Sequence, residues 1–155
     1  MTGRLIFVTA LPWLIASTVP SAFAAGTPAQ KCVGAKLKAA GKKLAAKMSC
    51  HAKAKVAGVA VDPTCLAKAE AKFTSAVTKA GAACAGTPAT LESPVDDCVT
   101  NFLPEVPGNG KCPADSAKAA GKEGSGLLGC RVKELTKPGS FALCDASVDG
   151  KLGTG

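Results

Sequence analysis

The sequence predicts an all-α protein: a disulfide-stapled antiparallel helical hairpin followed by a partial second hairpin, which together form a small helical bundle. Three observations predict this fold class. The 155-residue chain is rich in alanine and lysine and has no tyrosine, as is typical of helices around a thin core. It contains eight cysteines, all widely spaced. One lysine-rich stretch also recurs 80 residues after its first appearance.

Residues 1–24 have the features of a secretory signal peptide. Arg4 supplies a positive charge, an apolar run follows, and Ala22-Phe23-Ala24 places small residues at the −3 and −1 positions of a cleavage site. The alternative, an uncleaved anchor, is disfavoured by two prolines in the run. No later segment approaches 18 apolar residues, so we expect no transmembrane segment in the mature chain. We expect a secreted or periplasmic protein, where an even number of cysteines indicates disulfides.

The first hairpin is predicted over residues 25–86 from the spacing of four cysteines. Cys32 and Cys50 are 18 residues apart, and Cys65 and Cys84 are 19 apart. In helices these intervals are about 27 Å and about 28.5 Å long. Two antiparallel helices of similar length therefore pair Cys50 with Cys65 at the turn and Cys32 with Cys84 at the open end.

The helices of this hairpin are predicted over residues 32–57 and 63–83. Asp62-Pro63 is a favourable start, with aspartate as N-cap and proline at the first helical position. The second helix has the clearest amphipathic pattern in the chain, because its apolar residues recur at helical spacing. They are Leu66, Phe73 and Val77.

Residues 87–110 are predicted to form a linker with a short helix. Ser93-Pro94 is its expected start, which places Asp96 and Asp97 in the first turn, where acidic side chains are favourable. We interpret these two carboxylates as helix-start charges. The alternative is a catalytic acid pair.

Residues 111–155 are predicted to contain a partial second copy of the first helix and a flexible tail. Nine residues between 31 and 53 are identical to those 80 positions later. The identical positions are Lys31, Cys32, Lys38, Ala39, Ala40, Gly41, Lys42, Cys50 and Lys53. Chance similarity of two alanine- and lysine-rich helices is the alternative to a duplicated unit. Three glycines predict a break in this helix, and the tail is expected from Asp145; the glycines are Gly124, Gly126 and Gly129.

The repeat suggests the remaining disulfides. By analogy with the first hairpin, Cys130 pairs with Cys144. Cys112 then lacks an open-end partner, and Cys98 is left to supply it. Eight cysteines allow 105 pairings, so this connectivity is a hypothesis.

Three stretches of the sequence resemble a loose group of exported, largely uncharacterised bacterial proteins with lysine- and alanine-rich repeats and widely spaced cysteines. They are the stretch from Lys31 to Gly41, Cys50-His51-Ala52-Lys53, and the stretch from Val61 to Lys68. The resemblance implies an exported protein but no activity, and it assigns no functional residues.

No catalytic, cofactor-binding or metal site is expected, and we predict that the protein is not an enzyme. His51 is the only histidine, and its neighbour Cys50 is expected in a disulfide, so it lacks an evident catalytic partner. No two cysteines are closer than 14 residues, which disfavours zinc. Lys47 stands where a haem-attachment motif needs its first cysteine.

The charge distribution is the main functional indication. Residues 31–84 carry eleven lysines and two acidic residues, a balance of +9, whereas residues 85–155 have a balance of −2. We predict a structural or binding module with an unknown partner. The alternative is a cationic surface-binding or membrane-active factor that uses the lysines of 31–84 to recognise anionic lipid or cell-envelope polymer. Scarce arginine and absent tyrosine argue against specific nucleic-acid recognition.

Overall fold

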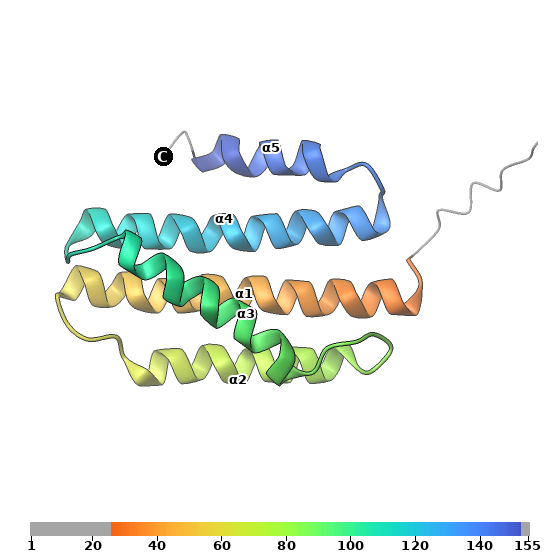
Figure 1. The fold of residues 1–155 in the computed structure, drawn as a ribbon, viewed down its shortest axis with the longest axis horizontal. Helices are drawn as coiled ribbons and strands as arrows, with labels where there is room; N and C mark the ends of the chain where they lie inside the picture. Colours follow the sequence, from red (N-terminus) through yellow and green to blue (C-terminus); the bar gives the residue numbers. More distant parts are fainter. Residues whose placement is uncertain (1–25, 153–155) are drawn as a thin grey trace, which may run out of the picture.

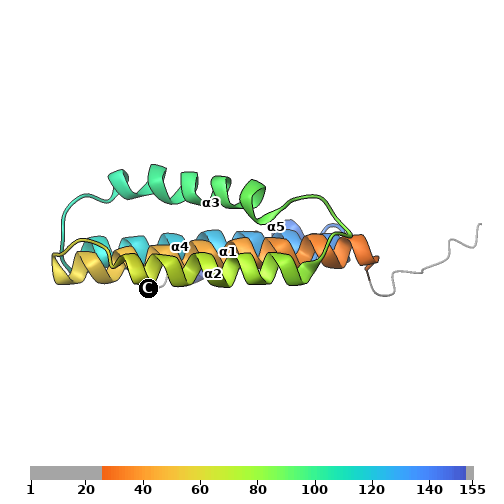
Figure 2. The ribbon, with the colours of Figure 1, turned by 90° about the horizontal axis from the view of Figure 1, so that it is seen from below.

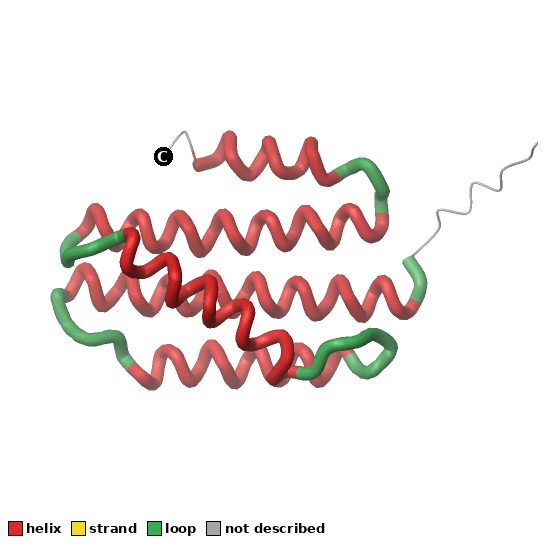
Figure 3. Tube along the Cα trace, viewed as in Figure 1, coloured by secondary structure: helices red, strands yellow, loops and turns green. Residues whose placement is uncertain are grey.

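The computed structural model describes residues 26–152, and all regular structure in this range is helical (Figure 3). The helices are α1 (Pro28–Ala57), α2 (Pro63–Ala80), α3 (Pro88–Phe102), the 3-10 helix η1 (Leu103–Glu105), α4 (Lys111–Thr136) and α5 (Phe141–Leu152). This confirms the predicted fold class, a small disulfide-stapled helical bundle. The predicted signal peptide, 1–24, lies outside the described residues.

Four helices form a single layer, and the fifth covers one of its faces. The order across the layer is α2, α1, α4, α5, with α3 crossing it diagonally (Figure 1). In the turned view α3 stands clear on one side of the layer, and no other described element lies on the opposite side (Figure 2). The layer therefore has one face covered by α3 and one uncovered face.

Local signals in the sequence define the first hairpin. Thr27 and Gln30 form a capping box at the start of α1, which ends at Gly58 with a left-handed φ of 67°. The Asp62 side chain accepts a hydrogen bond from the Thr64 amide at 2.8 Å, so the predicted N-cap of α2 is confirmed. Helix α2 ends at Ala80, slightly before the expected end, and α1 begins four residues before the expected start.

Three of the four predicted disulfides are present. Cys32–Cys84 and Cys50–Cys65 join α1 to α2 and the loop that follows it, and Cys130–Cys144 joins α4 to α5. The fourth pairing was wrong, because Cys98 and Cys112 are free and exposed. The buried positions of α3 and α4 near these cysteines are taken by other residues, namely Val95, Val99, Ala114 and Ala117, which leaves both thiols outside the core.

Helices α1 and α4 pack antiparallel along a seam of small residues. Gly34 lies beside Val132, and Gly41 lies beside Ser125. A Cβ atom added at Gly121 would come within 2.7 Å of the Met48 Cβ. The break predicted at Gly124, Gly126 and Gly129 was wrong, because α4 is continuous through them. Leu44 of α1 packs against Gly124 and Val148 of α5 against Gly126, and this packing outweighs the low helix propensity of glycine.

Two further expectations were wrong. Helix α3 begins at Pro88 with Thr87 as its cap, so Pro94 lies inside the helix and Asp96 and Asp97 are not in its first turn. The expected tail contains α5, which the disulfide to α4 and the packing of Val148 over Gly126 hold against the layer.

The core lies between α3 and the layer. Val95 and Val99 of α3 pack into one cluster with Leu44, Met48 and residues of α4. A second cluster joins Phe73 and Val77 of α2 to Ala39 of α1. Among the described helices, none combines the length and apolar character needed to span a membrane.

Candidate functional site

The lysines of α1 divide into two sets with different surroundings. One set contacts α3 and the loops on either side of it. This set consists of Lys36, Lys43, Lys47 and Lys55. The other set is exposed. Half of the eight lysines of α1 are therefore engaged within the fold.

Lys43 is the centre of a buried ion-pair network. Its side chain is 0% exposed, and its Nζ lies 2.6 Å from Glu70 of α2 and 3.0 Å and 2.9 Å from Glu92 and Asp96 of α3. It also lies over the Phe73 ring, 4.9 Å from the centroid. Burial opposes its charged form, but the three carboxylates outweigh burial and raise the pKa of Lys43.

The carboxylates of this network are half-buried, with 28–34% of each side chain exposed. Glu70 also pairs with Lys47, which contacts Asp96 at 2.6 Å. Burial would raise the pKa of Glu70, but its ion pairs with Lys43 and Lys47 outweigh burial and lower it to about 2. The oxygens of Glu70, Glu92 and Asp96 lie within 4.8 Å of one another, as metal ligands do. Here the ammonium groups already neutralise them, so a metal ion would have to displace two lysines.

The two end lysines of this set hold the loops around α3. Lys36 Nζ donates to the carbonyls of Cys84 and Gly86, at 2.9 Å and 2.7 Å, before the helix begins. Lys55 Nζ donates to the carbonyl of Val106 at 2.6 Å, after the helix ends. All four lysines thus position α3.

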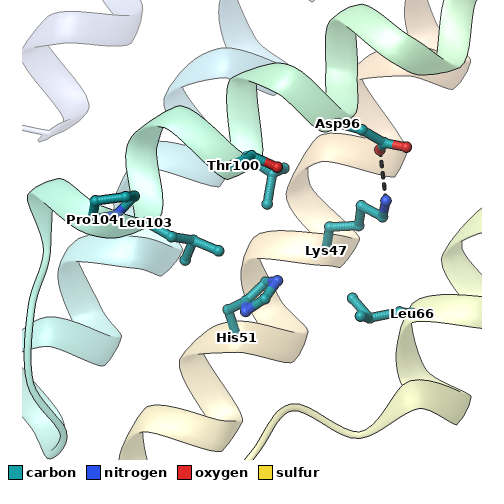
Figure 4. Close-up of a pocket in the computed structure, with 8 residues that line it drawn as sticks. Lys47, His51, Leu66, Asp96, Thr100, Leu103 and Pro104 are labelled. Carbon is teal, nitrogen blue, oxygen red and sulfur yellow. Dashed lines mark hydrogen bonds and ion pairs between the residues drawn. The ribbon is translucent and has the colours of Figure 1, made fainter.

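His51 lines a pocket of about 520 Å³ between α1, α2 and α3 (Figure 4). Its walls include Leu66 and Leu103, and Lys47 and Asp96 lie at one side, paired with each other. Burial, with the nearby positive charges of Lys47 and Lys55, lowers the pKa of His51, so the imidazole is neutral at pH 7. The pocket has the size of a small-molecule site, but its charged groups already serve the ion-pair network.

The exposed lysines of α1 lie on the uncovered face of the layer. They are Lys31, Lys38, Lys42 and Lys53. At 100° per residue they fall within about 60° of one another on the helix surface. Residues that contact α2 and α4 lie to either side of them, and Lys43 and Lys47 lie on the far side, toward α3. These four lysines therefore point away from α3.

Helix α4 has the same arrangement. The four exposed lysines of α1 are matched 80 residues later by Lys111, Lys118, Lys122 and Lys133, which are all exposed. The α3-facing lysines have no lysine at the matching positions, where Ser116, Glu123, Leu127 and Leu135 stand. The lysines that recur are thus the ones that the fold does not use. We call these eight residues the seam lysines, since they flank the α1–α4 seam.

Helix α2 extends the positive charge across the same face. Lys68, Lys72 and Lys79 are exposed and lie within about 40° of one another, on the side of α2 away from Glu70 and α3. With the seam lysines they form what we call the lysine face. Among the described residues of α1, α2 and α4, the one carboxylate on this face is Asp115, which pairs with Lys111 at 2.6 Å. Both side chains are exposed, so this ion pair is weak.

Sequence reasoning placed the positive surface on residues 31–84 alone and missed the contribution of α4. The net charge of the second half concealed it, because that half contains acidic residues of α3 that turn inward to Lys43. The signal was nevertheless present, since the seam lysines of α1 are all among the nine recurring residues.

Comparison with known proteins found no match among protein families, curated proteins or solved structures.

Proposed function

We propose that this protein is an exported, non-enzymatic binding module that engages anionic surfaces through the lysine face. The observation that carries the proposal is the division of the lysines. Those facing α3 are neutralised or hydrogen-bonded inside the fold, whereas those that recur in α4 are exposed together on the opposite face. A concentration of one charge attracts polyanions over distances comparable with the Debye length.

Three features support the other parts of this proposal. Three disulfides are typical of an oxidising compartment. Asp96, the carboxylate that lines the pocket beside His51, is ion-paired with Lys43 and Lys47, so it is not available to act on a substrate. The recurrence of the lysines also favours a binding role over a merely solvated surface, since solubility would not require the same positions in both helices.

The test is sedimentation with vesicles containing an anionic lipid, and with beads carrying an anionic polymer, at low and at high salt. We expect the protein to bind to at least one of them at low salt and to be released at high salt. A variant with Lys38, Lys42, Lys118 and Lys122 changed to glutamine should lose most of this binding. Neutral vesicles and underivatised beads are the controls. Failure to bind any anionic material at low salt would overturn the proposal.

A further inference from the structure

The seam lysines form a regular row along the α1–α4 seam. Contacts between small residues fix how the two helices are aligned, because Gly34 lies beside Val132, Gly41 beside Ser125 and Gly121 beside Ala45. A residue of α1 therefore lies level with a residue of α4 when their two residue numbers add up to about 166.

This alignment interleaves the lysines of the two helices. Lys133 lies about level with Val33, and Lys122 about level with Leu44. Lys118 and Lys111 lie about level with Met48 and Lys55. Together with the lysines of α1 they occupy five levels, about 8 Å apart, over about 36 Å at 1.5 Å per residue. The distances between successive lysine levels are the same from either end of the row, because the same positions carry lysine in two antiparallel helices.

The row is long and narrow. Helices that meet through glycine and alanine pack with axes about 8 Å apart, at the close end of the usual range. Eight lysines thus lie in a narrow double row, at about one lysine per 4.5 Å of its length, and one of them, Lys111, is paired with Asp115. Such a row matches an extended chain with an anion at each repeat unit better than it matches a single anion or a broad sheet of charge.

Apart from Asp115, the residues between the lysines are small. On the uncovered face of α1 they are Ala35, Ala46 and Ser49, and on α4 Gly129 lies among them. Membrane-surface helices bury tryptophan, phenylalanine or leucine in the lipid, and neither helix has such a residue among these positions. The same positions offer no aromatic ring on which a nucleobase could stack.

We infer that the ligand of the lysine face is a linear phosphate polymer, bound lengthwise along the α1–α4 seam. This inference rests on the proposed function and names the partner of that site. Lysine binds phosphate as a point charge, and an extended phosphate chain presents such charges in single file. The polymer lies over the small residues, with lysines of α1 on one side and lysines of α4 on the other.

The experiment measures binding of inorganic polyphosphate of defined chain lengths as a function of salt concentration. We expect affinity to rise with chain length and to level off once the chain spans about 36 Å. When the logarithm of the binding constant is plotted against the logarithm of the salt concentration, eight phosphate contacts predict a slope of about −5.6, at about −0.7 per contact as for a single strand. This slope corresponds to about a 10³-fold loss of affinity between 50 and 200 mM salt.

Three double variants, each lacking two lysines, separate a seam-bound polymer from general attraction. K38Q/K42Q and K118Q/K122Q should weaken binding equally and reduce the slope to about −4.2. K68Q/K72Q, on the same face but outside the seam, should leave the slope near −5.6. Equal effects of all three variants on polyphosphate binding would overturn the inference, because binding would then depend only on the total charge of the face.

Vesicles containing phosphatidylglycerol distinguish failure of this inference from failure of the proposed function. Binding to vesicles without binding to polyphosphate would overturn the inference of a polymer ligand but would leave the proposed binding of anionic surfaces in place. Absence of binding to both at low salt would overturn both. Circular dichroism of each variant, and the number of its free thiols, establish that it is folded.

Discussion

Lys42 and Lys43 are adjacent in the sequence, but they lie in opposite environments. Lys42 is exposed on the uncovered face, whereas Lys43 is fully buried among three carboxylates. One residue along a helix turns a side chain by about 100°, which is enough to move a lysine from the candidate binding surface to the interior. Composition alone cannot separate these roles.

Replacing Lys43 should therefore destabilise the protein, and replacing Lys42 should not. K43M leaves Glu70, Glu92 and Asp96 clustered with only Lys47 to neutralise them, and we expect a loss of about 3 kcal/mol, as when one partner of a buried ion pair is removed. Urea denaturation measures the loss. K42M is the matched control, with an expected change within about 0.5 kcal/mol. Equal stability of the two variants would show that the network contributes nothing.

Stability should also depend on pH through Glu70. Its pKa is lowered from 4.5 to about 2 in the folded protein, so the folded state resists protonation more than the unfolded state does. The stabilisation is complete above about pH 4.5 and is lost as the pH falls toward about 2, a loss of about 2 kcal/mol after allowance for partial exposure. Urea denaturation at a series of pH values should show the decline. E70Q should be less stable at pH 7 and show a smaller decline; an unchanged decline would contradict this assignment.

At the scale of the element, the glycines of α4 have different roles according to what each one faces. A Cβ at Gly121 would collide with Met48, whereas one at Gly129 would meet nothing within 4 Å. Glycine is therefore required at position 121 for the close approach of α1, whereas at position 129 it is only a weak helix former.

Alanine substitutions in α4 should therefore act in opposite directions. G121A should destabilise by about 1–3 kcal/mol, the usual cost of overpacking. G129A should stabilise by about 0.5–1 kcal/mol, since alanine has the better helix propensity and space is available. Thermal unfolding followed by circular dichroism compares the two variants with the parent. Stabilisation by G121A would contradict the close α1–α4 packing.

Helix α3 differs from the other helices because no disulfide holds it. Its Cys98 is free and exposed, as is Cys112 at the start of α4. Among the described residues, apolar contacts and the lysines of α1 hold α3 on the layer.

The thiols provide a direct check on the connectivity. A thiol-specific reagent should modify two cysteines per folded chain without denaturant, and mass mapping should place both labels at Cys98 and Cys112. C98S and C112S should each remove one reactive thiol with a stability change within about 0.5 kcal/mol. Absence of reactive thiols in the folded, unreduced protein would restore the fourth disulfide.

At the scale of the whole molecule, the disulfides connect neighbours within the layer but do not cross the α1–α4 seam. Cys32–Cys84 closes a segment of 52 residues, and Cys130–Cys144 closes one of 14. The cross-link that closes the longer segment restricts the unfolded chain more.

Removing these two cross-links should have unequal effects. Replacing Cys32 and Cys84 by serine should lower the free energy of unfolding by about 4 kcal/mol, and replacing Cys130 and Cys144 should lower it by about 3 kcal/mol. Chemical denaturation under non-reducing conditions measures both. A larger loss from the second pair would indicate that native-state packing around α5, and not the constraint on the unfolded chain, dominates.

Much of the first hairpin could be predicted because its determinants are local. Helical cysteine spacing identified its two disulfides, and Asp62-Pro63 identified the start of α2, since capping depends on adjacent residues. The 80-residue offset likewise predicted Cys130–Cys144. Local signals were misleading where distant packing prevailed: α4 continues through Gly124 and Gly126 because residues of α1 and α5 pack against them, and α3 continues through Pro94.

The sequence was sufficient to predict the helical class, three cysteine pairs and the recurrence of four lysines in two helices. The packing of the helices was needed to show which lysines are available to a partner. Their availability depends on where α3 lies, because its carboxylates and loops engage one side of α1 and leave the opposite side exposed. The same packing brings the second set of lysines, from a half of the chain with net negative charge, onto the face with the first.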